Sequence, residues 1–104
     1  MTDRLPLKLT PDAKNDLINI RRYTLEHWGR QQSTKYLTQL RRTMSLLAET
    51  PSMGIKRSDV GENIFSFPHT SHMIYYTVNT RQLVVFAVLH QSMIPSLHLQ
   101  DREV

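Results

Sequence analysis

Histidine is the side chain of this sequence best suited to chemistry near neutral pH. Three of the five histidines, His69, His72 and His98, are candidate metal ligands. A zinc site needs three or four ligands that converge in space, and no Cys is present to help. His69 and His72 run from a loop into a strand, where their spacing is not expected to put both rings on one face. We therefore expect structural or surface roles, with no metal and no other cofactor.

His90 ends the longest apolar run of the chain, Leu83–Leu89. A general acid or base works together with groups that position it and stabilise developing charge. A lone histidine without charged partners is a weak indication of catalysis. We expect His90 to form a local hydrogen bond that helps to seat the C-terminal segment.

Basic residues outnumber acidic ones, thirteen Lys and Arg against nine Asp and Glu, for a net charge of +4. This balance favours an acidic partner, either a nucleic acid or an acidic protein segment. The basic residues are scattered, and include the pairs Arg21-Arg22, Arg41-Arg42 and Lys56-Arg57. Solvated surface charges explain most of them equally well, so charge alone does not choose the partner.

Length and composition predict a globular protein. The hydrophobic fraction of 39% is too high for a disordered chain, and 104 residues suffice for one domain, residues 1–104. The first nine residues are too short and polar for a signal peptide, and no apolar run is long enough to span a membrane. The absence of Cys favours a reducing compartment. We expect a soluble, cytoplasmic protein.

Two amphipathic helices are predicted, over residues 11–28 and from about residue 31 to Glu49. Thr10 is a typical N-cap before Pro11, Gly29 supplies the end of the first helix, and Pro51 stops the second. The expected apolar faces are Ala13, Leu17, Ile20, Thr24 and Trp28, then Ser33, Leu37, Leu40, Met44 and Leu47. So short a break predicts an antiparallel helical hairpin.

Strands are predicted on both sides of the helices. Leu5, Leu7 and Leu9 alternate in a short strand that Pro6 assigns to a sheet edge. The later strands are Ile64–Phe67, His72–Val78 and Leu83–His90, with Asn79-Thr80-Arg81 as a tight connection and residues 51–61 as a loop. The expected fold is α+β, with an antiparallel twisted sheet covered by the helical hairpin. After about residue 91, Pro95 opens a helical turn with Leu97 and Leu99, or the tail frays.

Aromatic and methionine side chains are first of all expected in the core. Tyr23, Trp28 and Tyr36 gather at the turn between the helices, where they close the open end of the hairpin. Aromatic residues also anchor interfaces, so part of this group is available to a partner. Met53, Met73 and Met93 are expected as core fillers, although Met93 follows the last strand closely and is open to another role.

Several segments, in this order, resemble a known family. They are "LTPDAKNDL", "IRRYT", "HWG", Gln32, Tyr36-Leu37, "LAETPSMG", "FPHTSHMIYY" and "VLHQSM". Their order and spacing, from about Leu9 to Leu99, are similar to the ParE branch of the RelE/ParE toxins of type II toxin–antitoxin systems. The α+β architecture expected above agrees with the fold that this resemblance implies.

The resemblance implies a cytoplasmic toxin neutralised by a ParD-like antitoxin, whose disordered tail wraps the hairpin and the sheet. It also implies DNA gyrase as the target, with DNA contacted mainly through the antitoxin. In this family the C-terminal region bears on toxicity. The candidate partner-binding residues are Tyr23, Trp28, Tyr36, Arg57, His90, Gln91 and Met93. For Arg57, a solvated loop charge is the default, and contact with an acidic antitoxin tail or a gyrase–DNA complex is the alternative.

RelE-like relatives imply a different activity, ribosome-dependent cleavage of messenger RNA. This chemistry needs a base, an acid and fixed positive charge. The stretches Ile64–Phe67 and Tyr75–Thr77 offer a phosphate no obvious clamp, and the arginines that ParE-like sequences place near Phe65 and Thr77 are also missing. His90 is the main evidence in favour of cleavage, but one histidine without charged partners is a weak catalytic signal, so we expect no catalysis. A ribonuclease and an inactive, antitoxin-binding relative remain the alternatives.

Overall fold

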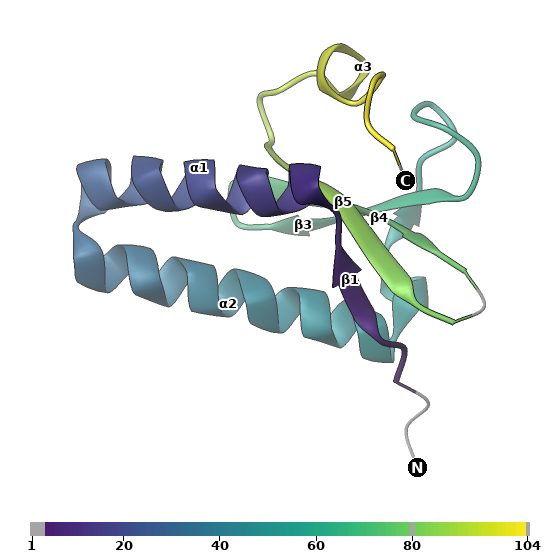
Figure 1. Cartoon of the computed structure of the whole chain (residues 1–104), viewed down its shortest axis with the longest axis horizontal. Helices are drawn as coiled ribbons and strands as arrows, with labels where there is room; N and C mark the ends of the chain where they lie inside the picture. The colour runs from purple at the N-terminus through teal and green to yellow at the C-terminus, as the bar shows by residue number, and fades with distance from the viewer. Residues whose placement is uncertain (1–3, 80, 104) are drawn as a thin grey trace.

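The structure is a computed structural model that describes residues 4–79 and 81–103. Figure 1 shows a helical hairpin beside a twisted sheet. The elements are β1 (Leu7–Leu9), α1 (Pro11–Trp28), α2 (Arg30–Glu49), the 3-10 turn η1 (Pro51–Met53), β2 (Ile55–Lys56), β3 (Ile64–His69), β4 (His72–Val78), β5 (Leu83–His90) and α3 (Pro95–His98). The predicted order is confirmed, and the tail takes the helical alternative. Residues 51–61, predicted as a loop, also contain η1 and β2.

The sheet has five strands in the order β1-β5-β4-β3-β2. Neighbours from β2 to β5 are antiparallel, and β1 is the predicted edge strand. The prediction of an antiparallel sheet is wrong for β1, which pairs parallel to β5 with Leu7 opposite Leu83 and Leu9 opposite Val85. Parallel pairing needs a long connection, and the hairpin and the other strands provide it.

Local signals fix the ends of the helices. The Thr10 side chain accepts a hydrogen bond from the Ala13 N–H at 3.2 Å, with Pro11 in the first turn. Gly29 ends α1 and begins α2 with φ 86° and ψ 169°, a conformation open to glycine because it has no Cβ. In the connection Asn79–Arg81, Thr80 lies outside the described residues. Asn79 Oδ1 accepts from the N–H groups of Arg81 and Gln82, as in an Asx turn.

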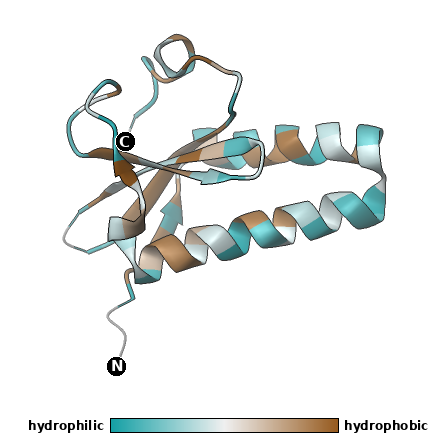
Figure 2. Ribbon diagram, turned by 180° about the vertical axis from the view of Figure 1, so that it is seen from behind, coloured by the Kyte–Doolittle hydropathy of each residue, from teal (hydrophilic) through white to brown (hydrophobic). Residues whose placement is uncertain are grey.

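The main core lies between the hairpin and one face of the sheet. Its fully buried members include Leu40, Met44, Leu47, Ile74, Tyr76 and Val85. The prediction of Trp28 on the apolar face is wrong, since its side chain is 45% exposed. Leu37 is also only partly buried, and its neighbour Tyr36 is buried instead. The closed end of the hairpin projects past the sheet, so nothing from the sheet covers that end fully (Figures 1 and 2).

A second apolar cluster lies on the sheet face that α1 and α2 do not cover. It comprises Ile64, Tyr75, Phe86, Ala87, Leu89 and Leu99, with Val60 and Met73 against it. Leu99 brings the C-terminal tail onto this face, whereas Leu97 points to solvent. The core role predicted for the methionines is wrong for Met53 and Met93, which are exposed. Across the described ranges, no helix is long and apolar enough to cross a membrane.

Candidate partner-binding cleft

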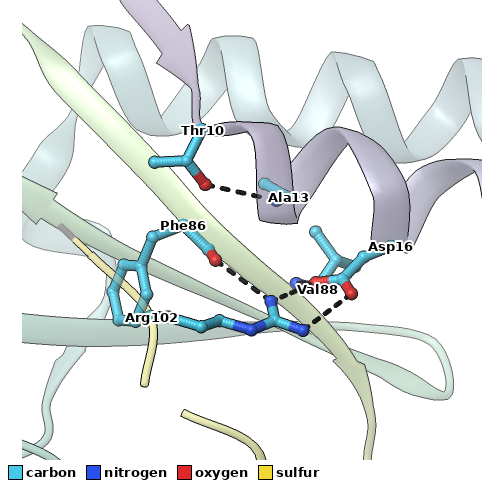
Figure 3. A network of polar contacts seen from close by, with 6 residues as sticks. All are labelled: Thr10, Ala13, Asp16, Phe86, Val88 and Arg102. Atoms are coloured by element: carbon cyan, nitrogen blue, oxygen red, sulfur yellow. Dashed lines mark hydrogen bonds and ion pairs between the residues drawn. The ribbon is translucent and has the colours of Figure 1, made fainter. Parts of the chain in front are cut away.

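The outer edge of β5 is closed by side chains where β1 ends. Thr10 N–H still donates to Val85 O, after which no strand of the described residues continues along this edge of β5. Val88 N–H then donates to Asp16 Oδ2 at 2.9 Å, and Arg102 Nη1 donates to Phe86 O at 3.1 Å (Figure 3). Two side chains thus satisfy backbone groups that a neighbouring strand would otherwise pair.

Asp16 and Arg102 also form a buried ion pair. Arg102 Nη1 and Nη2 lie 2.6 and 2.9 Å from the two carboxylate oxygens, in a bidentate arrangement (Figure 3). The hydrogen bond to Asp16 raises the pKa of Arg102 above its usual value. Sequence reasoning missed this pair. The available signal was a carboxylate beside the apolar positions Leu17 and Ile20 of α1, a place where only a paired charge is tolerated.

A cleft of about 690 Å³ lies between α1, the end of β5 and the C-terminal tail. The side chains that line it include Tyr23, Trp28, His90 and Met93, four of the seven candidate partner-binding residues. Tyr23 is 55% exposed and Met93 43% exposed. The Asp16–Arg102 pair and His72 also line the cleft. Hence α1 and the tail, far apart in sequence, together present an apolar and aromatic surface.

The other three candidates lie elsewhere. Tyr36 is buried behind the cleft, with its ring edge against Trp28 at 5.6 Å between centroids. Of the aromatic group predicted to close the hairpin, therefore, only Tyr36 is a core residue, because the side chains of Tyr23 and Trp28 are about half exposed. Gln91 is exposed, and its N–H donates to Ser71 O.

Arg57 is not a freely solvated loop charge, contrary to the default prediction. Its guanidinium donates to both carboxylate oxygens of Asp59 and to Ser66 Oγ, and lies 5.5 Å from the centroid of the Tyr75 ring. Tyr75 belongs to the second apolar cluster, so Arg57 is on the sheet face away from the hairpin. The loop before β3 folds over this face, which sequence spacing did not reveal.

Three histidines meet around Tyr36. The expectation that His69 and His72 do not share a face is wrong, because β3 and β4 form a hairpin in which these two residues are opposite one another. The Tyr36 hydroxyl lies 2.6 Å from His72 Nδ1 and 3.3 Å from His69 O. The His90 ring lies against His72, with 5.5 Å between ring centroids. Burial and, to a smaller extent, charge repulsion from His90 and His69 together lower the pKa of His72 to about 4.

Acidification is therefore expected to destabilise the fold through His72. In the unfolded chain the His72 side chain is protonated below its ordinary pKa of 6.5, whereas in the folded chain it is protonated only below about pH 4. The contribution of neutral His72 to the free energy of unfolding is therefore complete above about pH 6.5, and about 3 kcal/mol of it is lost as the pH falls to 4. Urea unfolding from pH 7 to pH 4 measures this loss. His72→Gln should flatten the profile, and the exposed His98→Gln should not; equal slopes for all three proteins would contradict the assignment.

His90 makes the local contact expected for seating the tail. The Ser92 N–H donates to His90 Nδ1 at 3.1 Å, and Ser92 Oγ lies 2.7 Å from the same nitrogen. Within the described part of the cleft, the charged side chains are Asp16 and Arg102, which are paired with each other. No group of three or more His, Asp or Glu among residues 4–79 and 81–103 is arranged to hold a metal ion.

The chain is similar to known toxins over nearly its whole length. The family model described as "ParE toxin of type II toxin-antitoxin system, parDE" matches residues 7–95. The chain belongs to the ParE toxin family. The family resemblance of the sequence segments is thereby confirmed.

Two relatives show how similar the chain is to known proteins of this kind. Toxin ParE1 of Caulobacter vibrioides is 34% identical over 94 residues, which cover 90% of this chain and 97% of the relative. A chain of the solved structure "Chromosomal ParDE TA system from P. aeruginosa" superposes with a TM-score of 0.74. That match covers 84% of this chain and 96% of the other at 15% identity, and so supports the ParE-like fold alone.

Proposed function

We propose that this chain is a toxin that acts by binding proteins, with DNA gyrase as its target and a ParD-like antitoxin as its inhibitor. The family match over residues 7–95 carries this proposal. It is supported by the names of the relatives, one a toxin and the other part of a ParDE system. Both partners are expected to be met in the cytoplasm.

The cleft has the composition of a protein-binding site. Its half-exposed Tyr23, Trp28 and Met93 are the kinds of side chain that anchor interfaces. Its paired Asp16 and Arg102 leave no free cation there to clamp a phosphate, within the part of the chain that is described. Binding without catalysis is the mode of action that these groups support.

Expression of the chain alone and together with a ParD-like antitoxin tests the proposal. The chain alone should arrest growth with filamentation and the SOS response, and co-expression of the antitoxin should restore growth. The purified chain should produce gyrase-dependent double-strand breaks in plasmid DNA. Unchanged supercoiling and cleavage by gyrase would exclude this target.

The cleft surface itself is tested with two substitutions. Tyr23→Ala and Met93→Ala should each weaken binding of the antitoxin or of gyrase by about tenfold or more, as expected for interface anchors. Both side chains are about half exposed, so the fold should tolerate the change. Leu46→Ala is the matched control, because Leu46 is 46% exposed but does not line the cleft. Equal affinities for all these variants, measured by calorimetry, would remove the cleft from both interfaces.

The alternatives give different outcomes in the same assays. A RelE-like ribonuclease would cleave messenger RNA on ribosomes and lose this cleavage in His90→Ala, because His90 is the candidate acid–base group at the end of β5. An inactive relative would be harmless at every expression level while still binding the antitoxin. Intact messenger RNA together with gyrase-dependent DNA breaks excludes both.

A further inference from the structure

The chain after β5 forms an arch, residues 91–102, that is attached to the rest of the molecule at its two ends. Figures 1 and 2 show α3 standing away from the sheet, after which the chain turns back toward it. At the first end, the Gln91 N–H donates to a carbonyl of the turn between β3 and β4 at 2.8 Å. At the second end, Leu99 is buried in the second apolar cluster, and Arg102 is paired with Asp16.

The middle of the arch, Ile94–His98, has concave surface on both of its sides. Met93 and His98 line the cleft, and Pro95 and Ser96 line a cavity over the second apolar cluster. Within the described part of the chain, no backbone hydrogen bond joins the middle of the arch to the sheet or to α1. The position of the middle therefore depends on how the two ends are held.

The side chains of the arch are apolar, exposed and uncharged. Ile94 is 57% exposed and Leu97 73% exposed, and with Met93 they place three exposed large apolar side chains within five residues. Residues 91–100 contain no Asp, Glu, Lys or Arg. Exposed apolar groups of this kind mark sites of interaction. A nucleic acid needs cations to bind its phosphates, so the partner that fits the arch is an apolar surface of a protein.

The second end of the arch is fixed in direction by one side chain. Arg102 donates both to the carboxylate of Asp16 on α1 and to Phe86 O on β5 (Figure 3). Asp16 and Arg102 are 86 residues apart in the sequence. The planar guanidinium binds a carboxylate in one preferred orientation, so the pair restricts the arch more than the apolar contact of Leu99 does. An arch that is ordered before binding loses less conformational entropy when a partner binds it.

We propose that Asp16 is a positioning residue for target binding. Through Arg102 it holds the arch in the conformation in which Ile94 and Leu97 contact an apolar surface of the target protein. Asp16 itself lies under the guanidinium and acts without touching the target. Neither Ile94 nor Leu97 was among the candidate partner-binding residues of the sequence. This inference rests on the proposed function, in which the target is DNA gyrase.

Substitution of Arg102 tests the positioning role. Arg102→Met keeps an unbranched side chain but removes the hydrogen bonds to Asp16 and Phe86 O. It should raise the toxin concentration for half-maximal gyrase-dependent DNA cleavage by about tenfold, because the loosened arch must be ordered on binding. Cleavage at saturating toxin should be unchanged, and Arg102→Lys should recover part of the loss. Arg81→Met is the matched control, since this exposed arginine precedes β5, at the opposite end of the strand from the arch.

Substitutions in the middle of the arch test the contact itself. Leu97→Ser and Ile94→Ser should each raise the same concentration by about tenfold, as expected for interface anchors. Hydrogen exchange of the arch should stay unchanged in both, whereas Arg102→Met should accelerate it. Arg102→Met should also have a smaller effect when combined with Leu97→Ser, because the order of the arch matters only while its middle makes the contact.

Binding to a ParD-like antitoxin separates positioning from general stability. Calorimetry should show that Arg102→Met changes this affinity by less than about threefold, since the variant keeps its hairpin and sheet. Equal losses toward antitoxin and gyrase would overturn the positioning role, and so would unchanged gyrase cleavage despite faster exchange of the arch. Failure of the wild-type chain to affect gyrase contradicts the proposed target instead. The dose of each variant that arrests growth then decides on the arch, and equal doses for Arg102→Met and Arg81→Met would refute it.

Discussion

Asp16→Ala is expected to lower the free energy of unfolding by about 3 kcal/mol. The substitution leaves the Arg102 guanidinium, only 17% exposed, without its carboxylate, and leaves the Val88 N–H without an acceptor. The tail that carries Arg102 should also loosen, since this pair ties it to α1. Urea unfolding measures the loss of stability, and hydrogen exchange of the backbone after residue 91 measures the loosening.

A double-mutant cycle separates the pair from its surroundings. Arg102→Ala and Asp16→Ala together should destabilise the protein by clearly less than the sum of the single changes, because the double variant leaves no unpaired buried charge. Asp59→Ala is the control, since it breaks the exposed pair with Arg57 and should hardly move the urea midpoint. Additive single effects at Asp16 and Arg102 would show that the pair contributes nothing of its own.

Gly54→Ala is expected to lower the free energy of unfolding by about 3 kcal/mol, from overpacking and a lost hydrogen bond. A Cβ at Gly54 would overlap the Tyr76 hydroxyl and ring. Tyr76 is fully buried, and its hydroxyl donates to Pro51 O at 2.6 Å, so the ring has little room to move. The backbone of Gly54 has φ −77°, which alanine adopts freely, so backbone strain does not contribute to the loss.

Gly61→Ala is the matched control for this prediction. Its nearest contact would be Ile64 Cγ1 at 3.4 Å, an ordinary van der Waals distance, so stability should change little. Tyr76→Phe, with Gly54 left unchanged, removes only the hydrogen bond to Pro51 O, which contributes about 1 kcal/mol. Chemical denaturation of the three variants ranks them. A Gly54→Ala protein as stable as Gly61→Ala would mean that Tyr76 and Pro51 adjust without loss.

Local signals were enough to predict most of the elements. The N-cap at Thr10, the glycine between the helices and the proline after Glu49 act within a few residues of themselves, so their effects are visible in the sequence. Contacts between distant segments were not visible in this way. Three such features depend on the tertiary fold. They are the parallel pairing of β1 with β5, the ion pair of Asp16 with Arg102, and the pairing of His69 with His72 across β3 and β4.

The candidate site was predicted in part for the same reason. Tyr23, Trp28, His90 and Met93 were selected by residue type and family resemblance, and the structure places them around one cleft. Their partner-binding role stays a prediction. For Arg57 the sequence predicts a solvated loop charge by default, because its acceptors, Asp59 and Ser66, approach it only once the loop folds over the sheet. The exposure of side chains at the closed end of the hairpin likewise depends on how far the sheet extends, and the periodicity of apolar residues in a helix does not predict this.

Another concave surface, of about 520 Å³, lies between α1 and α2, where Leu17, Ile18 and Leu37 line it. It and the cleft are on opposite sides of α1, which sets a condition on any ligand that occupies both. With side chains, a helix is about 10 Å across, so the path around half of it is about 16 Å, or about five extended residues. A linker of at least that length would let one polypeptide clasp the helix. Release at one site would then leave the other engaged, and avidity would slow dissociation far below the rate for either site alone.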